Sequence, residues 1–217
     1  MDIKKTANLL INFTVKRLAE IFGIILSAAG VFLLITLLTY SPDDPNFIFP
    51  DNTKINNFFG FRGSFIADLF FQSIGIISYL FSLTLIITGV NIFRLKEFFL
   101  IIENIFYAII YSIFGTFFLS HFYSNAFALY INGNGGFVGN YFNKTFLNSI
   151  ILINESIFYY ILIFLILILF LVSINFHPIK FYEKIKFLLK IFSKKNEKNY
   201  TDKSEIISQY IPQDEIK

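Results

Sequence analysis

The sequence predicts an all-α integral membrane protein with four transmembrane helices. Of its 217 residues, 55% are hydrophobic and only 15% are charged, whereas a soluble domain carries about 25% charged residues. The mean hydropathy is +0.64. Four stretches have the length of about 20 apolar residues that is needed to cross a bilayer. Backbone amides in hydrocarbon must be satisfied within their own segment, which favours helices. This composition argues against a soluble, disordered or nucleic-acid-coating protein.

The transmembrane domain is expected to cover residues 19–176. The predicted spans are residues 21–40, 69–93, 98–122 and 156–176. The first apolar run is too long for a secretory signal and lacks a small-residue cleavage site, so we expect it to remain in the membrane. Residues 1–18 are predicted to be a cytoplasmic segment. Residues 177–217 are predicted to be a basic juxtamembrane segment and the start of a disordered linker.

The placement of Lys and Arg predicts the orientation. Fifteen of these 18 residues lie before the first span, between the second and third spans, or after the fourth span. The two remaining connections carry Lys54, Arg62 and Lys144. Positive charge is enriched on the cytoplasmic side of membrane proteins, so both termini are expected in the cytoplasm. The lysine-rich and aromatic residues 179–198 favour contact with an anionic membrane surface over contact with nucleic acid.

The first outer connection contains prolines and adjacent acids that end the first helix. Ser64 is predicted to cap the second helix, with Asp68 in its first turn, where the helix dipole favours an acid. Alternatively, Asp68 pairs with Arg62 or contacts a partner. The candidate partner contacts in this region are Asp43, Asp44, Pro45, Arg62 and Asp68.

The second outer connection is rich in glycine. Gly135 and Gly136 are expected to form a hinge, because clustered glycines disfavour a helix interior. No Gly-Lys-Ser or Gly-Lys-Thr follows them, so this is not a phosphate-binding loop. Residues 137–153 are apolar with polar interruptions, which predicts one interfacial or half-inserted helix.

Small residues on the first two spans predict close helix packing. The expected packing positions are Ala19, Gly23 and Ser27 on the first span, and Gly75, Ser78 and Ser82 on the second. We expect spans one and two to form the packed centre, and span four to face lipid or another subunit. The alternative is that these small residues are scattered at random.

Catalytic, metal and cofactor sites are not expected. The chain has no cysteine and two distant histidines, and no nucleophile–base pair is evident. No acid, base or polar cluster is predicted deep within a span, since Glu103 and Glu155 lie near span ends. This argues against a transporter or an intramembrane enzyme. A small transporter or channel subunit is kept as the alternative function.

Several motifs resemble the N-terminal four-span domain of the FtsK/SpoIIIE DNA translocases. The resemblance covers residues 16–173. It is carried by Lys-Arg-Leu-Ala-Glu-Ile-Phe-Gly at 16–23, Tyr-Ser-Pro-Asp-Asp-Pro-Asn-Phe at 40–47, Gly60, Gly63, Ala67, Asp68, Gly75, Gly135, Gly136 and Gly139. The chain departs from the family at residues 154–156, where the family usually has glycines. This departure concerns the local turn and leaves the expected topology unchanged.

The resemblance implies a membrane anchor for a DNA translocase in cell division and chromosome segregation. It implies a place at the septum of the bacterial inner membrane, contacts with other division proteins, and a homo-oligomer that is hexameric like the family's motor. The phosphate-binding motif of the family's motor, Gly-x-x-x-x-Gly-Lys-Ser/Thr, does not occur in these 217 residues. We therefore expect no ATPase activity and no direct nucleic-acid binding from this chain.

Overall fold

A computed structural model describes residues 3–45, 54–124 and 132–179, together with residues 182, 183, 186 and 189. The chain divides into two units, residues 1–175 and residues 176–217. The first unit contains every helix discussed below. Most of the predicted juxtamembrane segment and linker lies outside the described residues.

The described part of the first unit contains helices and no strand. The elements are α1 (Ile3–Leu38), α2 (Gly60–Ile74), a 3₁₀ turn η1 (Gly75–Ile77), α3 (Ser78–Leu95), α4 (Leu100–Phe122), α5 (Gly136–Asn143), α6 (Phe146–Ile151) and α7 (Glu155–Ser173). Four candidate membrane spans lie in α1, in α2 with α3, in α4 and in α7. The predicted all-α membrane fold is confirmed.

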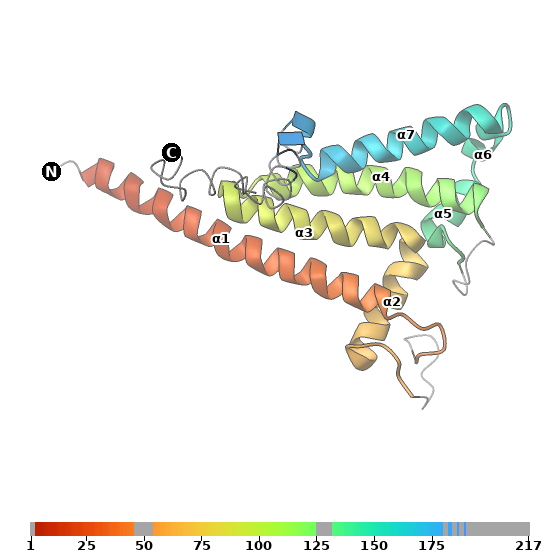
Figure 1. Ribbon diagram of the computed structural model, residues 1–217, viewed down its shortest axis with the longest axis horizontal. Helices are drawn as coiled ribbons and strands as arrows, with labels where there is room; N and C mark the ends of the chain where they lie inside the picture. Colours follow the sequence, from red (N-terminus) through yellow and green to blue (C-terminus); the bar gives the residue numbers. More distant parts are fainter. Residues whose placement is uncertain are drawn as a thin grey trace, which may run out of the picture. The chain divides into compact units, whose positions relative to one another are not determined.

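The four long helices pack in the order α1, α3, α4, α7 (Figure 1). Helices α3 and α4 therefore occupy the middle, and α7 packs on α4 at one edge. Spans one and two were expected to form the centre. They do contact each other, through α1 and α3, but α1 lies at an edge of the bundle and not in its centre. The third span takes the second central place because it buries small residues of its own, Ala108 and Gly115, which permit close helix approach.

Neighbouring long helices run antiparallel, so the first unit has two ends. We call the end that holds the α3–α4 turn the terminal end, because α1 starts and α7 finishes there (Figure 1). An ion pair at this end joins Glu20 of α1 to Lys96 after α3 at 2.8 Å. We call the opposite end, where α2, α5 and α6 lie, the loop end.

The predicted continuous helix over residues 69–93 is interrupted at Gly75. This residue has φ +59°, a left-handed conformation that glycine adopts without steric cost. Helix α2 precedes the break and α3 follows it, and Figure 1 shows that the two helices run at a steep angle to each other. Helix α2 begins at Gly60, so Ser64 lies inside the helix and is not its cap.

The single helix predicted over residues 137–153 is instead two short helices, α5 and α6. The chain leaves the helical conformation at Thr145, whose ψ is 175°. The Thr145 side chain then accepts a hydrogen bond from the backbone N–H of Leu147 and caps α6. A threonine in this position ends one helix and begins the next, because its hydroxyl replaces a missing backbone partner.

Helix α1 is longer than the predicted first span. It begins at Ile3 and has 36 residues, whereas the apolar run alone predicted a start at residue 21. Lysine and arginine are good helix formers, so Lys16 and Arg17 do not end it. Residues 8–18 are all exposed in the first unit.

Candidate functional site

The glycine-rich connection between α4 and α5 packs against the junction where α2 passes into α3. The backbone N–H of Ile76 donates to the carbonyl of Asn134 at 3.0 Å. A Cβ added at Gly75 would overlap this carbonyl, and one added at Gly136 would overlap the backbone of Ser73 and Gly75. Gly136 also has a positive φ of +63°. Only glycine allows both the backbone conformation and the close approach at this junction.

Asp68 joins α1 to α2 at the loop end. The Tyr40 hydroxyl donates to Asp68 Oδ1 at 3.1 Å, and Gln72 Nε2 donates to the same oxygen at 3.4 Å. The residue is only 5% exposed. Asp68 is not in the first turn of α2, because it lies about two turns after the start of the helix. It is also not paired with Arg62, since its hydrogen-bond partners are the two neutral donors Tyr40 and Gln72.

The same hydrogen-bonded path continues from Gln72 to α5 and α4. Asn132 Nδ2 donates to Gln72 Oε1 at 3.1 Å, and Asn140 Nδ2 donates to the carbonyl of Asn132 at 2.7 Å. Ser120 Oγ donates to Asn140 Oδ1 at 2.8 Å. We call this set the loop-end network; its members are Tyr40, Asp68, Gln72, Asn132, Asn140 and Ser120. The network connects α2, α4 and α5 with the glycine-rich connection and with the segment that follows α1.

The connection between α1 and α2 is held at its start by Asp44. Its two carboxylate oxygens accept the backbone N–H groups of Asn56 at 2.7 Å and Asn57 at 2.9 Å. The Ser64 hydroxyl donates to the carbonyl of Pro45 at 3.2 Å. Charge-assisted bonds to a carboxylate are stronger than neutral ones, so Asp44 holds the two ends of this connection together, and Ser64 joins the connection to α2.

The structure separates the five predicted partner contacts into two groups. Asp43 and Arg62 are exposed, whereas Asp44, Pro45 and Asp68 are buried. The buried residues bind within the loop end and present little surface to another protein. The hinge expected at Gly135 and Gly136 is a packed contact, because a Cβ on Gly135 would overlap the carbonyl of Thr116 in α4.

The predicted small residues of α1 lie against α3. Ala19 and Gly23 are buried. A Cβ on Gly23 would overlap the backbone of Gly89 and Phe93. Ser27 Oγ donates across the interface to the carbonyl of Ile86 at 3.1 Å. This is close backbone packing of the kind that small residues permit in membranes.

The predicted small residues of the second span are also buried. Ser78 Oγ donates to the carbonyl of Gly75 at 2.6 Å, and Ser82 Oγ donates to that of Tyr79 at 2.7 Å. These bonds stay within one chain turn and do not cross to α1. The residue of α3 that meets Gly23 is Gly89, which is not among the predicted packing positions. It lies seven residues after Ser82, on the same helix face.

A buried polar network lies between α3, α4 and α7. The hydroxyls of Thr84 and Tyr111 share a hydrogen bond of 2.9 Å. Asn104 Nδ2 donates to Thr88 Oγ1 at 3.0 Å. Ser173 Oγ is 3.3 Å from Thr84 Oγ1 and donates to the carbonyl of Asn104 at 3.2 Å. These five residues are at most 1% exposed.

Asn175, which follows α7, completes this network. Its Nδ2 donates to Asn104 Oδ1 at 3.0 Å. Asn91 Nδ2 donates to the carbonyl of Ile174 at 3.2 Å, which adds a second bond from α3 to the end of α7. We call this set the terminal-end network; its members are Thr84, Thr88, Asn91, Asn104, Tyr111, Ser173 and Asn175.

The terminal-end network corrects the expectation that no polar cluster lies within the spans. The sequence does contain its signal. Thr84, Thr88 and Asn91 recur at spacings of four and three residues, and Asn104 and Tyr111 are seven apart, so each set lies on one helix face. The missing information was that these two faces meet.

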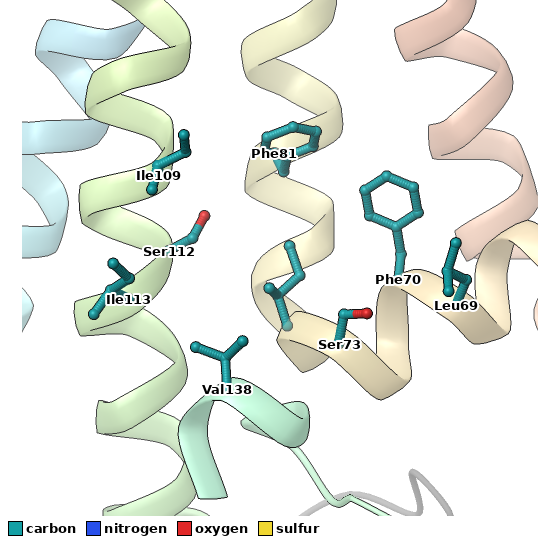
Figure 2. Close-up of a pocket in the computed structure, with 9 residues that line it drawn as sticks. Leu69, Phe70, Ser73, Phe81, Ile109, Ser112, Ile113 and Val138 are labelled. Carbon is teal, nitrogen blue, oxygen red and sulfur yellow. The ribbon is translucent and has the colours of Figure 1, made fainter. Parts of the chain in front are cut away.

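An apolar cavity of about 330 Å³ lies in the elbow between α2 and α3. Figure 2 shows its walls: α2 contributes Leu69 and Phe70, and α4 contributes Ile109 and Ile113. Val138 of α5 lies at its base. The buried Ser112 hydroxyl, which lines the same cavity, has no hydrogen-bond partner. The break at Gly75 produces this cavity, because it turns α2 away from the line of α3.

Comparison with known proteins identifies the family of this chain. Residues 15–186 match the model of the 4TM region of DNA translocase FtsK/SpoIIIE. The chain belongs to this family. It is also similar to a DNA translocase FtsK of Azospirillum brasilense, with 35% identity over 79 residues. That alignment covers 36% of this chain and 12% of the relative. No solved structure matches.

The FtsK/SpoIIIE 4TM match covers most of α1 and all of α2 to α7. Both polar networks therefore belong to the 4TM region of this chain. Among the described residues, no group of three His, Asp or Glu side chains could hold a metal ion. The polar groups of both networks are directed at one another, so their chemistry is that of holding helices together.

Proposed function

We propose that this chain anchors a DNA translocase that acts in bacterial cell division and chromosome segregation. The observation that carries the proposal is the 4TM match over residues 15–186. The four apolar helices support it, because they are long enough to hold the chain in a bilayer. In this proposal the domain lies in the inner membrane at the septum, with both ends in the cytoplasm.

The proposed anchor works by packing. At the loop end, buried hydrogen bonds and glycine contacts fix the two outer connections against the spans. At the terminal end, a second network joins the end of α7 to α3 and α4. A rigid bundle of this kind would hold an attached domain at the membrane. Association of several copies, as the family resemblance implies, is part of the same proposal.

The alternative of a transporter or channel subunit gains no support from the terminal-end network. Intramembrane polar groups on a transport path must be available to bind an ion or substrate. Here Asn104 uses its amide nitrogen, its amide oxygen and its backbone carbonyl on neighbouring side chains. Such a site has little capacity left for a passing ligand.

Localisation of the full chain, fused to a fluorescent protein in dividing bacteria, tests the proposal. We expect the fusion in the membrane fraction and concentrated at the septum. The exposed residues Asp43 and Arg62 are the proposed contacts with division proteins. An Asp43→Asn, Arg62→Gln double variant should therefore stay in the membrane and lose its septal enrichment.

The matched control is Lys54→Gln, which neutralises an exposed charge in the same connection and should leave septal enrichment unchanged. A wild-type fusion spread evenly over the membrane would contradict the septal role. A soluble fusion would contradict the anchor itself.

A further inference from the structure

We propose that an ethanolamine lipid headgroup binds in a small pocket where α4 ends and α7 begins. The pocket has a volume of about 240 Å³ and is lined by Phe122, Glu155, Ser156, Tyr159 and Tyr160. It therefore combines aromatic rings with one carboxylate. The proposal depends on the chain being a membrane protein and not on its role in division.

The ring geometry favours an organic cation. Phe122 and Tyr159 have centroids 5.1 Å apart and planes at 88°. Tyr159 and Tyr160 have centroids 5.4 Å apart and planes at 87°. Consecutive rings at right angles form adjoining walls of a pocket. Aromatic ring faces attract ammonium groups, including primary ones such as those of lysine and ethanolamine.

Glu155 supplies the matching charge. It is exposed in the first turn of α7, and it forms no ion pair with any residue that the structure describes. One N–H group in the first turn of α7, that of Ile157, donates to Asn154 Oδ1 at 3.2 Å and so does not engage the Glu155 carboxylate. The carboxylate is thus available to a ligand at the mouth of the pocket.

Tyr159 is held in place by a neighbour outside the pocket. Its hydroxyl shares a hydrogen bond of 2.7 Å with the hydroxyl of Tyr123. Its ring also packs on Phe118, with centroids 5.3 Å apart. One wall of the pocket is therefore positioned before any ligand arrives, which reduces the entropy lost on binding.

The location of the pocket at the start of a candidate span favours a lipid as the source of the cation. The pocket lies where a candidate span starts, at the level where tyrosines and lipid headgroups meet. Tyr160, Phe164 and Leu167 recur along one face of α7 and are 72%, 66% and 52% exposed. A lipid whose ammonium group enters the pocket would lay its acyl chains along this apolar face. A free amine or a lysine side chain would make no use of it.

The test is lipid retention by the purified full chain, measured by native mass spectrometry. The chain is equilibrated with equal amounts of phosphatidylethanolamine and phosphatidylglycerol. We expect preferential retention of phosphatidylethanolamine. Glu155→Gln and Tyr160→Leu should each reduce that preference about three-fold, the size expected for one exposed charge or cation–π contact.

The matched control is Glu103→Gln, which removes an exposed glutamate from the first turn of α4 at the opposite end of the spans. It should retain phosphatidylethanolamine as the wild type does. Equal retention of both lipids by the wild type, or an unchanged preference in Glu155→Gln, would overturn the proposal.

Competition by lysine amide separates the two sources of an ammonium group. We expect lysine amide to displace little of the bound phosphatidylethanolamine, because it lacks acyl chains. Binding of lysine amide without retention of phosphatidylethanolamine would instead assign the pocket to a partner's lysine and refute the lipid site. Septal localisation plays no part in either measurement, so failure here leaves the anchor proposal standing.

Discussion

At the scale of single residues, two buried serines, Ser112 of α4 and Ser173 of α7, differ in whether their hydroxyl groups form a hydrogen bond. Ser173 donates within the terminal-end network, whereas Ser112 lines the elbow cavity and has no partner. A buried polar group costs free energy when it is unpaired and contributes when it is bonded. The same Ser→Ala substitution should therefore lower the free energy of unfolding at Ser173 but not at Ser112.

Ser173→Ala is expected to lower the free energy of unfolding by about 0.5–1.5 kcal/mol, as for other hydrogen bonds within membrane bundles. Ser112→Ala is expected to leave it unchanged or raise it, because the variant removes an unbonded hydroxyl. Denaturant unfolding of both variants in the same detergent measures the difference. Equal losses in the two variants would show that Ser112 is bonded in the folded protein.

At the scale of elements, Gly75 determines how α2 meets α3. Gly75→Ala should destabilise the bundle for two reasons: its φ is +59°, and the new Cβ would overlap the carbonyl of Asn134. Gly60→Ala is the matched control, because Gly60 has a similar φ of +63° with nothing within 4 Å of the added Cβ.

Gly60→Ala should lower the free energy of unfolding by about 1–2 kcal/mol, the penalty for placing alanine in a left-handed conformation. Gly75→Ala should cost more than Gly60→Ala, and the excess measures the steric term. Thermal unfolding in detergent gives both values. The same cost in both variants would mean that the contact with Asn134 relaxes easily.

The sequence predicts elements well where hydrophobicity alone decides them. The apolar runs behind α4 and α7 predicted helices within a few residues of the observed bounds. The break at Gly75 was missed because its cause is the backbone of Asn134, a residue about 60 positions later in the chain. The split between α5 and α6 depends on a single threonine cap, which an apolarity pattern does not register.

The candidate contacts show the same limit. Asp44 and Asp68 were predicted as partner contacts, a role that requires an exposed side chain. Both are buried, because each accepts hydrogen bonds from another segment of the chain. Asp44 accepts from the backbone N–H of Asn56, at the other end of the same connection, and Asp68 accepts from the Tyr40 hydroxyl. Their positions follow from the way α1 and α2 pack, which residue type alone does not reveal.

At the scale of the whole molecule, the antiparallel order of the long helices makes a prediction about topology. Reporters fused after residue 217 are expected in the cytoplasm, whereas reporters inserted near residues 50 and 128 are expected outside it. The reason is the concentration of Lys and Arg before the first span, between the second and third spans, and after the fourth span in the sequence. Paired enzyme reporters, one active only in the cytoplasm and one only outside, measure all three sites. An external reporter at residue 217 would invert the proposed orientation.

The bonds of Asn175 and Ser173 have a mechanical consequence. Tension applied to the chain after residue 175 would reach Asn104 of α4 through both side chains, and α3 through the carbonyl of Ile174. The pull would be divided among three helices before α7 could be peeled from its neighbour. A chain that leaves the bundle at residue 175 therefore transmits its load to α3 and α4 as well as to α7. Three helices that share a load resist extraction from the membrane better than α7 would alone.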